Sequence, residues 1–343
     1  LKALVFMKHV GLNVAADALM TLAYSGVRGA LVVVTADDPG CHSSQNEQDN
    51  RLLARFANLP LLEPATPQEA HELTKFAFEF SAFLQTPVVV RTTTRVAHAR
   101  GPVVLGPLGK PAGKGRFERD PDRFVMLPAH AREGHKRALQ RLRLAEGISE
   151  SSPPHRLMEL KEPRDTGYLT AGVAHTYLVE FADALAGKVF KLGLTNPLPR
   201  GRLVEFLRSV RRVVVIEELE PFLEDAVRAL ANEHRIDIEV YGKAQGLFSR
   251  TGELDPDAVA EALVRIGALD PDAVQRIRDV KMPKLPARPP VLCPGCGHRA
   301  AAYAARQATR RTDVLFPLDI GCYSLVEYPP VRAGDVLLCM GAS

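Results

Sequence analysis

Four of the five cysteines of this chain lie between residues 293 and 339. Cys293 and Cys296 flank a Pro-Gly turn, and Cys322 follows an Asp-Ile-Gly run. A Cys-x-x-Cys turn can direct two thiolates to one metal ion or cluster, and a later cysteine can complete the ligand set. The spacing alone fits an iron–sulfur cluster, a structural zinc site and simple buried or redox-active thiols equally well.

Cys339 differs from the other three because it ends the apolar run Val336-Leu337-Leu338. A thiol in such a place is expected to pack as a small hydrophobe, so we do not count it as a ligand. Gly341 and Ser343 follow it in a strand-to-turn segment, where backbone N–H groups can approach a phosphate or a thiazole.

Two histidines each follow an apolar or turn segment. His9 and His42 each precede small polar residues, and the segment from His42 to Asn46 comes shortly after the predicted strand Ala30–Ala36. Open α/β sheets place their ligands at this edge. The alternative is local: a helix beginning near Gln45, with Ser43 or Ser44 as N-cap and Glu47 completing a capping box.

Charged residues mark two further strand ends. Arg95 follows the predicted strand Pro87–Thr92, where its guanidinium could receive a substrate carboxylate through two hydrogen bonds; the alternative is a solvated or paired surface arginine. Glu217, Glu218 and Glu220 resemble an acid–base cluster. We favour a structural role for them at a helix start, where carboxylates meet the positive end of the helix dipole.

Composition excludes several classes of function. The 44 basic and 40 acidic residues give a net charge of +4, and aromatic residues make up 6% of the chain, which argues against nucleic acid binding. No apolar run is long enough to cross a bilayer, and no secretion signal is visible, so we expect a cytoplasmic protein with reduced cysteines. The chain begins at Leu1 without an initiator Met and stops at Ser343 after an apolar run, so we expect both ends to be cut.

The elements that must position these residues alternate between short β-branched runs and longer amphipathic segments. This alternation is typical of βαβ units around mainly parallel sheets, so we predict a multidomain α/β protein. We predict strands at Ala30–Ala36, Pro87–Thr92, Tyr168–Ala171, Lys188–Leu192 and Arg212–Glu217. We predict helices at Pro67–Leu84 (capped by Thr66, with Glu69 three residues on), Ala129–Glu146, His175–Leu185, Arg200–Ser209 and Glu220–Arg235. Residues 255–280 are predicted to be helical, with Asp-Pro pairs at helix starts.

Several of these motifs together resemble a known enzyme family. The segment Lys8–Asp17, Asp37-Asp38-Pro39, the string from His42 to Arg51, Cys293-Pro-Gly-Cys296 and Asp319-Ile-Gly-Cys322-Tyr323 are similar, in this order, to the large subunit of indolepyruvate:ferredoxin oxidoreductases. These belong to the thiamine-diphosphate-dependent 2-oxoacid:ferredoxin oxidoreductases. The resemblance implies transketolase-like folds: a pyrimidine-binding domain over residues 1–128 with a linker from about residue 101, a helical connector over 129–164, a transketolase C-terminal-like domain over 165–280 and the start of a diphosphate-binding domain over 281–343.

The resemblance also implies an activity. We expect an aryl 2-oxoacid, indolepyruvate, to react with coenzyme A and oxidised ferredoxin to give an acyl-CoA, CO₂ and reduced ferredoxin. Decarboxylation leaves a carbanion-like enamine that thiamine diphosphate stabilises, and its two electrons leave singly through an iron–sulfur cluster. The implied cofactors are thiamine diphosphate, Mg²⁺ and a [4Fe-4S] cluster, and the implied partners are a smaller (beta) subunit, ferredoxin and coenzyme A.

Site residues follow from these positions in the sequence together with the resemblance. We assign His9, His42 and Asn46 to catalysis, Asp319, Gly321, Gly341 and Ser343 to cofactor binding, Arg95 to the substrate, and Cys293, Cys296 and Cys322 to the cluster by similarity to sister enzymes. The alternative for the cysteines is that they line the cofactor site without a cluster. The activating glutamate and the Gly-Asp…Asn diphosphate motif of the family are not found between Leu1 and Ser343, so we expect these 343 residues alone to be inactive.

Two other functions stay open. One is the same chemistry on pyruvate, 2-oxoglutarate or a branched 2-oxoacid. The other is a non-catalytic module that uses the Cys-x-x-Cys site to hold zinc and bind a partner.

Overall fold

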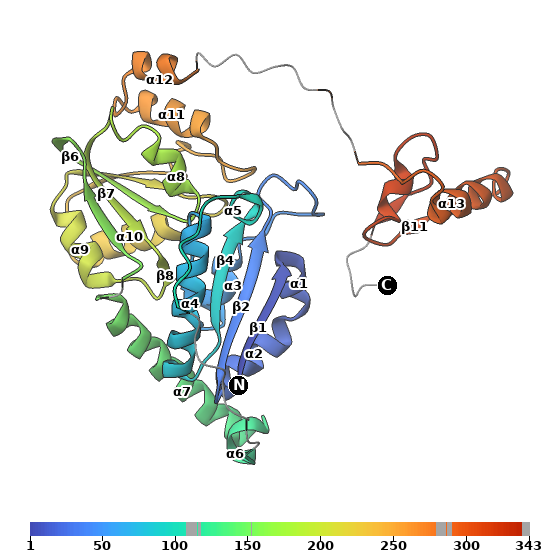
Figure 1. Ribbon diagram of the computed structural model, residues 1–343, viewed down its shortest axis with the longest axis horizontal. Helices are drawn as coiled ribbons and strands as arrows, with labels where there is room; N and C mark the ends of the chain where they lie inside the picture. The colour runs from blue at the N-terminus through green and yellow to red at the C-terminus, as the bar shows by residue number, and fades with distance from the viewer. Residues whose placement is uncertain (108–114, 116–117, 152, 279–285, 287–289, 338–343) are drawn as a thin grey trace. The chain divides into compact units, whose positions relative to one another are not determined.

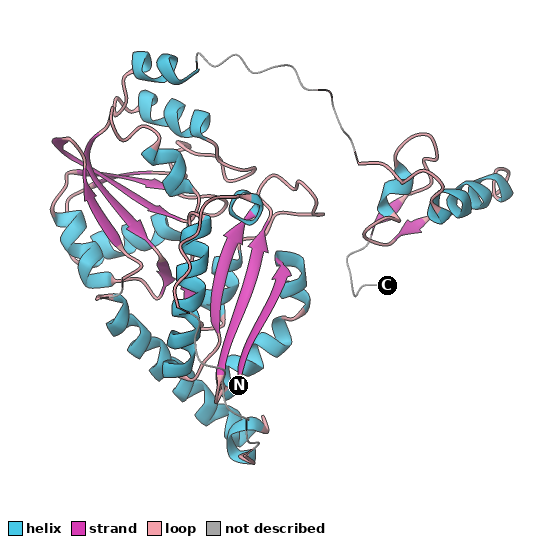
Figure 2. Ribbon diagram, viewed as in Figure 1, coloured by secondary structure: helices cyan, strands magenta, loops and turns pink. Residues whose placement is uncertain are grey.

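The computed structural model describes residues 1–107, 115, 118–151, 153–278, 286 and 290–337. The chain divides into two compact units, Leu1–Arg278 and Asp279–Ser343. Figure 2 shows the strands of the first unit in two groups, each accompanied by helices. The fold class is therefore α/β with mainly parallel sheets, as the alternation of apolar runs predicts.

The first sheet has the strand order β1-β2-β4-β3-β8. Its strands are β1 (Lys2–Lys8), β2 (Ala30–Asp37), β3 (Leu61–Leu62), β4 (Val88–Thr93) and β8 (Leu194–Asn196), of which β8 alone pairs in the antiparallel sense. Its helices are α1 (His9–Val14), α2 (Ala16–Ser25), α3 (Asn50–Phe56), α4 (Pro67–Leu84) and α5 (Thr94–His98). In Figure 1, α4 lies along β4 and β2.

Strands β2 and β4 of this sheet are buried on both faces. Val32, Val88 and Val90 pack under α4, while Val33 and Val89 pack against the helices of the opposite face. Successive strand residues thus point into different cores, which explains why β2 and β4 are apolar at nearly every position. The polar residues of these strands are confined to their carboxyl ends.

The second sheet has the strand order β10-β9-β6-β7-β5. Its strands are β5 (Arg156–Glu159), β6 (Glu162–Ala171), β7 (Ala186–Leu192), β9 (Arg212–Ile216) and β10 (Glu239–Tyr241), and β5 is antiparallel to β7. The accompanying helices are α8 (Ala174–Val179), α9 (Arg200–Arg208), α10 (Phe222–Glu233), α11 (Pro256–Arg265) and α12 (Pro271–Arg278).

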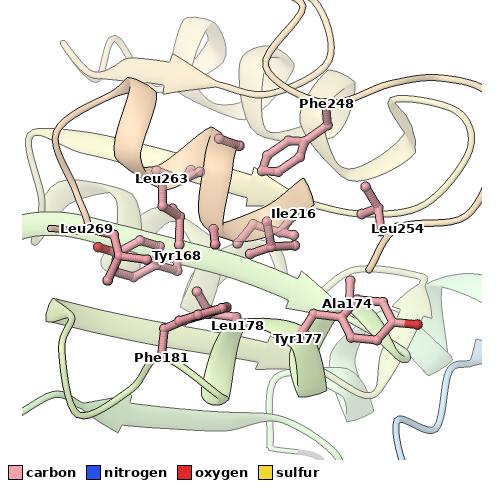
Figure 3. Packing of buried hydrophobic residues seen from close by; sticks show 14 of the residues in the cluster. Tyr168, Ala174, Tyr177, Leu178, Phe181, Ile216, Phe248, Leu254, Leu263 and Leu269 are labelled. Atoms are coloured by element: carbon pink, nitrogen blue, oxygen red, sulfur yellow. The ribbon is translucent and has the colours of Figure 1, made fainter. Parts of the chain in front are cut away.

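Figure 3 shows the core on one face of the second sheet, where Tyr168 and Ile216 from the strands meet Leu178 of α8 and Leu263 of α11. Val96 of α5 belongs to the same cluster, so this core joins the second sheet to an element of the first. Two further helices, α6 (Pro121–Phe124) and α7 (Pro128–Ser149), connect the parts, and α7 packs on α2 and α4.

Most predicted elements are present within a few residues of their expected bounds. Thr66 caps α4 through a hydrogen bond from the Glu69 N–H, and Asp255 caps α11 with Pro256 at the first helical position, as predicted. The predicted helix His175–Leu185 is wrong beyond Val179, where α8 ends and the chain turns so that Phe181 and Leu185 reach the core.

The second unit is small. It contains α13 (Gly297–Ala308), the parallel pair β11 (Pro317–Leu318) and β12 (Val336–Leu337), and the 3-10 turn η1 (Ser324–Glu327). Leu292, Val326, Val331 and Ala333 form its core. None of the described helices, in either unit, is long and apolar enough to cross a membrane.

Candidate functional site

Polar residues gather where β2 and β4 end. Asp37 closes β2, Asp38 follows it, and the segment 38–49 then crosses this edge of the sheet before α3 begins; we call this segment the β2–α3 loop. Because β2 and β4 are parallel neighbours, the side chain of Thr94, the residue that follows β4, reaches Asp38. The predicted residues His42 and Asn46 lie in this loop, at the edge where parallel sheets bind their ligands.

Asp38 organises the loop. Its buried carboxylate accepts hydrogen bonds from the His42 N–H at 3.2 Å, the Ser43 N–H at 2.9 Å, the Ser44 hydroxyl at 2.7 Å and the Thr94 hydroxyl at 2.8 Å. Burial alone would raise the pKa of Asp38, but these hydrogen bonds and Lys8, 3.6 Å away, hold it well below its ordinary value. Asp38 is therefore ionised, and the loop folds around its charge.

His42 and Arg95 converge on one carboxylate, that of Glu253. The His42 Nε2 lies 3.1 Å from Glu253 Oε2, and Arg95 donates from Nε at 2.7 Å and through its Nη2. The hydrogen bond from Arg95 is the main reason why the pKa of Glu253 is lowered. The side chains of His42 and Arg95 remain 43% and 55% exposed, so both are open to a ligand. The alternative of a paired surface arginine is thus what this structure contains for Arg95.

Glu253 was missed by the sequence reasoning. It lies in a Thr-Gly-Glu-Leu segment without a recognisable motif, and only the fold brings it next to His42. Glu47 connects the loop to the same segment, because its Oε1 accepts hydrogen bonds from the Gly40 N–H at 2.5 Å and from the Gly252 N–H at 2.8 Å. Gly40 has a φ of +86°, a conformation that glycine adopts without strain. The loop is therefore joined to the segment that carries Glu253.

His9 and Asn46 are also brought together, but through the main chain. The fully buried His9 ring places Nε2 3.1 Å from the Asn46 carbonyl oxygen, while its Nδ1 has no hydrogen-bond partner among the described residues. The Asn46 side chain accepts from the Gln48 amide at 3.0 Å. His9 thus supports the β2–α3 loop from the protein interior, whereas His42 lies on the exposed side of the loop.

The alternative reading of this loop, a capping box, is wrong. The helix begins at Asn50 rather than near Gln45, and Asp49 caps it by accepting from the Arg51 N–H. Ser43 and Ser44 are unavailable as caps because Asp38 holds both of them, and Glu47 faces Gly40 and Gly252. The capping pattern of the sequence does not form, because the buried carboxylate of Asp38 binds the serines instead.

A network of buried charges lies behind the loop and joins the two sheets. Arg51 is 1% exposed, donates to Asp49 and to the Glu217 Oε2 at 2.6 Å, and also donates to the carbonyl oxygens of Glu218 and Glu220. Burial would raise the pKa of Asp49, yet Arg51 and then Arg91 lower it to about 2. Burial prevails at Glu217, whose pKa is raised despite Arg51.

Glu217 has the structural role that the sequence favoured. Its carboxylate accepts from the N–H groups of Leu223 and Glu224, the first turn of α10. The helix start is therefore capped by Glu217 rather than by Glu220, the residue next to Pro221. Arg91 of β4 forms a second buried group with Asp37 at 2.6 Å and Glu63 at 2.5 Å.

The described cysteines of the second unit, Cys293, Cys296 and Cys322, are free thiols. The Cys296 N–H donates to the Cys293 carbonyl, so the Cys-x-x-Cys turn is formed. His298 lies 3.5 Å from Cys296 Sγ through Nδ1, and its ring packs edge-on against Tyr323, the neighbour of Cys322. Within the described part of the chain, however, no group of three Cys, His, Asp or Glu side chains is arranged to hold a metal ion.

The predicted cofactor residues are only partly described. Asp319 Oδ1 accepts from the Ile320 N–H at 2.7 Å, and Gly321 has a φ of +96°, so these residues form a tight exposed turn. Gly341, Ser343 and the predicted buried thiol Cys339 lie outside the described residues.

Comparisons with known proteins show the family of this chain. No protein-family model matches the chain. The chain is 43% identical over 349 aligned residues to the indolepyruvate oxidoreductase subunit IorA of Methanothermobacter thermautotrophicus, and 42% identical over 358 aligned residues to that of Thermococcus kodakarensis. Both alignments cover the whole chain but only 56% and 54% of the relatives' length, so the chain spans about half of the curated relatives it matches.

A solved structure supports the fold. The 2-oxoglutarate:ferredoxin oxidoreductase from Magnetococcus marinus, with 2-oxoglutarate, coenzyme A and succinyl-CoA bound, superposes with a TM-score of 0.55 at 15% identity over 76% of this chain and 52% of its own. At this identity the likeness concerns the fold alone. Six curated IorA subunits, at 39–43% identity, align with every part of this sequence, and the chain belongs to the indolepyruvate oxidoreductase subunit IorA family.

Proposed function

We propose that the protein takes part in the oxidative decarboxylation of a 2-oxoacid, indolepyruvate, with coenzyme A as acyl acceptor and ferredoxin as electron acceptor. The observation that carries this proposal is the alignment of the whole chain with indolepyruvate oxidoreductase subunits. The fold shared with a structure that holds a 2-oxoacid and coenzyme A is consistent with it.

We place the reaction at the β2–α3 loop. His42 is the residue best suited to hold or transfer a proton there, because its ring is partly exposed and the carboxylate of Glu253 orients it. His9 and Asp38 act as positioning residues, since they hold the loop through Asn46 and through the hydrogen bonds to residues 42–44.

Arg95 is proposed to bind the carboxylate of the 2-oxoacid. Its guanidinium already carries a carboxylate on two nitrogens, that of Glu253, which has the geometry a substrate carboxylate would adopt. A substrate must displace Glu253, and this displacement would release Glu253 from Arg95 while His42 stays beside it. Glu253 would thus link the binding of the substrate at Arg95 to His42, the group that carries the proton.

Thiamine diphosphate, held through Mg²⁺, is the cofactor we propose, because it supplies the electron sink that protein side chains lack. On this chain the turn at Asp319 and Gly321 offers a carboxylate and exposed backbone to such a group. Gly341 and Ser343 are proposed as cofactor residues from the sequence alone. The smaller subunit and ferredoxin are the proposed partners. We propose a cytoplasmic location, where cysteines stay reduced.

Cys293, Cys296 and Cys322 remain a prediction as cluster ligands, and the conformation of the described residues does not gather them. If they bind a [4Fe-4S] cluster, the anaerobically reconstituted protein is brown, and Cys296→Ser together with Cys322→Ser removes about four iron atoms per chain relative to Cys41→Ser. Cys41 is an exposed cysteine outside this unit and serves as the control. Equal iron in the two proteins would exclude these ligands, and stoichiometric zinc would favour a structural metal site.

The substrate can be tested in the full-length enzyme, assembled with its smaller subunit. We expect the CoA-dependent reduction of ferredoxin to have a higher kcat/KM with indolepyruvate than with pyruvate or 2-oxoglutarate. A higher kcat/KM with either of the other two acids would retain the reaction type and reject the substrate. No CoA-dependent reduction with any of them would reject the reaction.

A further inference from the structure

A pocket of about 250 Å³ opens at the junction of the two sheets. Its lining comes from α3, from α7, from β8 of the first sheet with the residues that follow it, and from α9 and α10 of the second sheet. Pockets for drug-sized ligands usually measure about 300–1,000 Å³, so this one suits a smaller molecule, of the size of a free amino acid. The lining includes none of the described residues that we assign to the proposed reaction.

One wall of the pocket is apolar, because a single stripe of α10 faces it. Phe222, Ala226 and Ala229 lie on successive turns of this helix, and Leu198 adds to the apolar lining. The two alanines leave open the space that larger side chains on the same stripe would fill. The pocket therefore offers room for an apolar group beside the Phe222 ring.

Arg55 of α3 supplies an accessible cation to this pocket. Its side chain is exposed, and its guanidinium carbon lies 5.6 Å from the centre of the Phe222 ring. In the part of the chain that the structure describes, the guanidinium forms neither an ion pair nor a hydrogen bond. A guanidinium next to an aromatic ring keeps N–H groups free for a carboxylate, so Arg55 can bind an anionic group beside the apolar wall.

Glu146 of α7 supplies the opposite charge to the same pocket. Its side chain is 38% exposed, and its carboxylate makes only a long contact of 3.7 Å with Arg200 Nε, because Arg200 donates through Nη2 to Glu233 at 2.5 Å. Asn196 also lines the pocket, and its Nδ2 donates to the Leu59 carbonyl at 2.6 Å, so its Oδ1 is the atom of the amide that can accept. Acceptors for an ammonium group thus line the same pocket as Arg55.

We propose that this pocket binds an α-amino acid with an apolar side chain. Arg55 binds the carboxylate, Glu146 and Asn196 bind the ammonium group, and the apolar side chain packs on the α10 stripe. A carboxylic acid without the amino group would leave Glu146 without a cation, and an amine without the carboxylate would leave Arg55 without an anion, so the zwitterion matches both charges. The proposal does not depend on the oxidoreductase activity.

The test is calorimetric titration of the assembled full-length enzyme with L-phenylalanine. We expect saturable binding that weakens about tenfold or more in Arg55→Gln, which removes the cation, and in Ala226→Leu, which fills the space beside the apolar wall. Arg208→Gln, at an exposed arginine of α9, is the matched control and should bind as the wild type does. No saturable binding, or equal affinities of Arg55→Gln and Arg208→Gln, would overturn the proposal.

Two further measurements separate this pocket from the proposed reaction site and define the ligand. Arg95→Gln should keep the wild-type affinity for L-phenylalanine; a loss of binding there, with binding retained in Arg55→Gln, would assign the ligand to the β2–α3 loop and refute the proposal. Phenylpropanoate, which lacks the amino group, should bind about tenfold more weakly than L-phenylalanine, because Glu146 then receives no cation. Equal binding of the two compounds would refute an amino acid site.

Discussion

At the scale of single residues, the carboxylate of Asp38 holds the β2–α3 loop in place. Asp38 carries hydrogen bonds from two backbone N–H groups and two hydroxyls, and its pKa lies well below the ordinary value. The sequence indicated that residues 42–46 matter, because they follow a buried strand. The sequence could not indicate Glu253, because no motif or regular spacing connects this residue to His42.

The depressed pKa of Asp38 leads to a prediction about pH. A carboxylate with a lowered pKa in the folded state contributes stability that is present above its unfolded pKa, about 3.9, and is lost as pH falls toward the folded value. We expect Asp38→Asn to lower the melting temperature at pH 7 and to have a progressively smaller effect below pH 4. Asp122→Asn, at an exposed carboxylate, is the control; an effect of Asp38→Asn that does not change with pH would contradict this account.

At the scale of elements, the contacts that join the sheets are buried ion pairs as well as apolar cores. Arg51 lies in the first turn of α3 beside the first sheet, and it reaches Glu217, the residue that follows β9 of the second sheet. The sequence predicted most of the long strands and helices, since their periodicity is strong, but it did not predict β1, α1 and α2. It did not predict β3 and β8, which are too short to show a pattern, nor the true start of α3, because Asp38 captured the serines that were expected to cap it.

Replacing Arg51 should destabilise the junction between the two sheets. Arg51→Met leaves the buried carboxylates of Asp49 and Glu217 without their cation, so we expect a loss of about 3–5 kcal/mol in the free energy of unfolding, measured with denaturant. Arg55→Met is a matched control, because Arg55 lies over the same Phe222 ring but is exposed, and should cost no more than about 1 kcal/mol. Equal losses for the two variants would show that the ion pairs do not stabilise the junction.

At the scale of the whole molecule, the fold class followed from apolar strands that alternate with amphipathic helices, because only parallel sheets with both faces covered bury such strands. The pairing of β8 with β3, which adds a strand from beyond α7 to the first sheet, was not visible in the sequence. Such long-range pairing depends on how the two sheets meet rather than on any local pattern. For the same reason, the three cysteines of the second unit could be named as candidates but not placed relative to one another.

The most direct test of the proposed site is the turnover of indolepyruvate by the assembled enzyme carrying His42→Asn. We predict that kcat for CoA-dependent ferredoxin reduction falls about 100-fold or more, with the melting temperature nearly unchanged, because a partly exposed proton-carrying group is lost and the core is not. His98→Asn, at an exposed histidine of α5, should retain wild-type turnover. Wild-type turnover in His42→Asn would contradict the assignment of the β2–α3 loop as the site of the reaction.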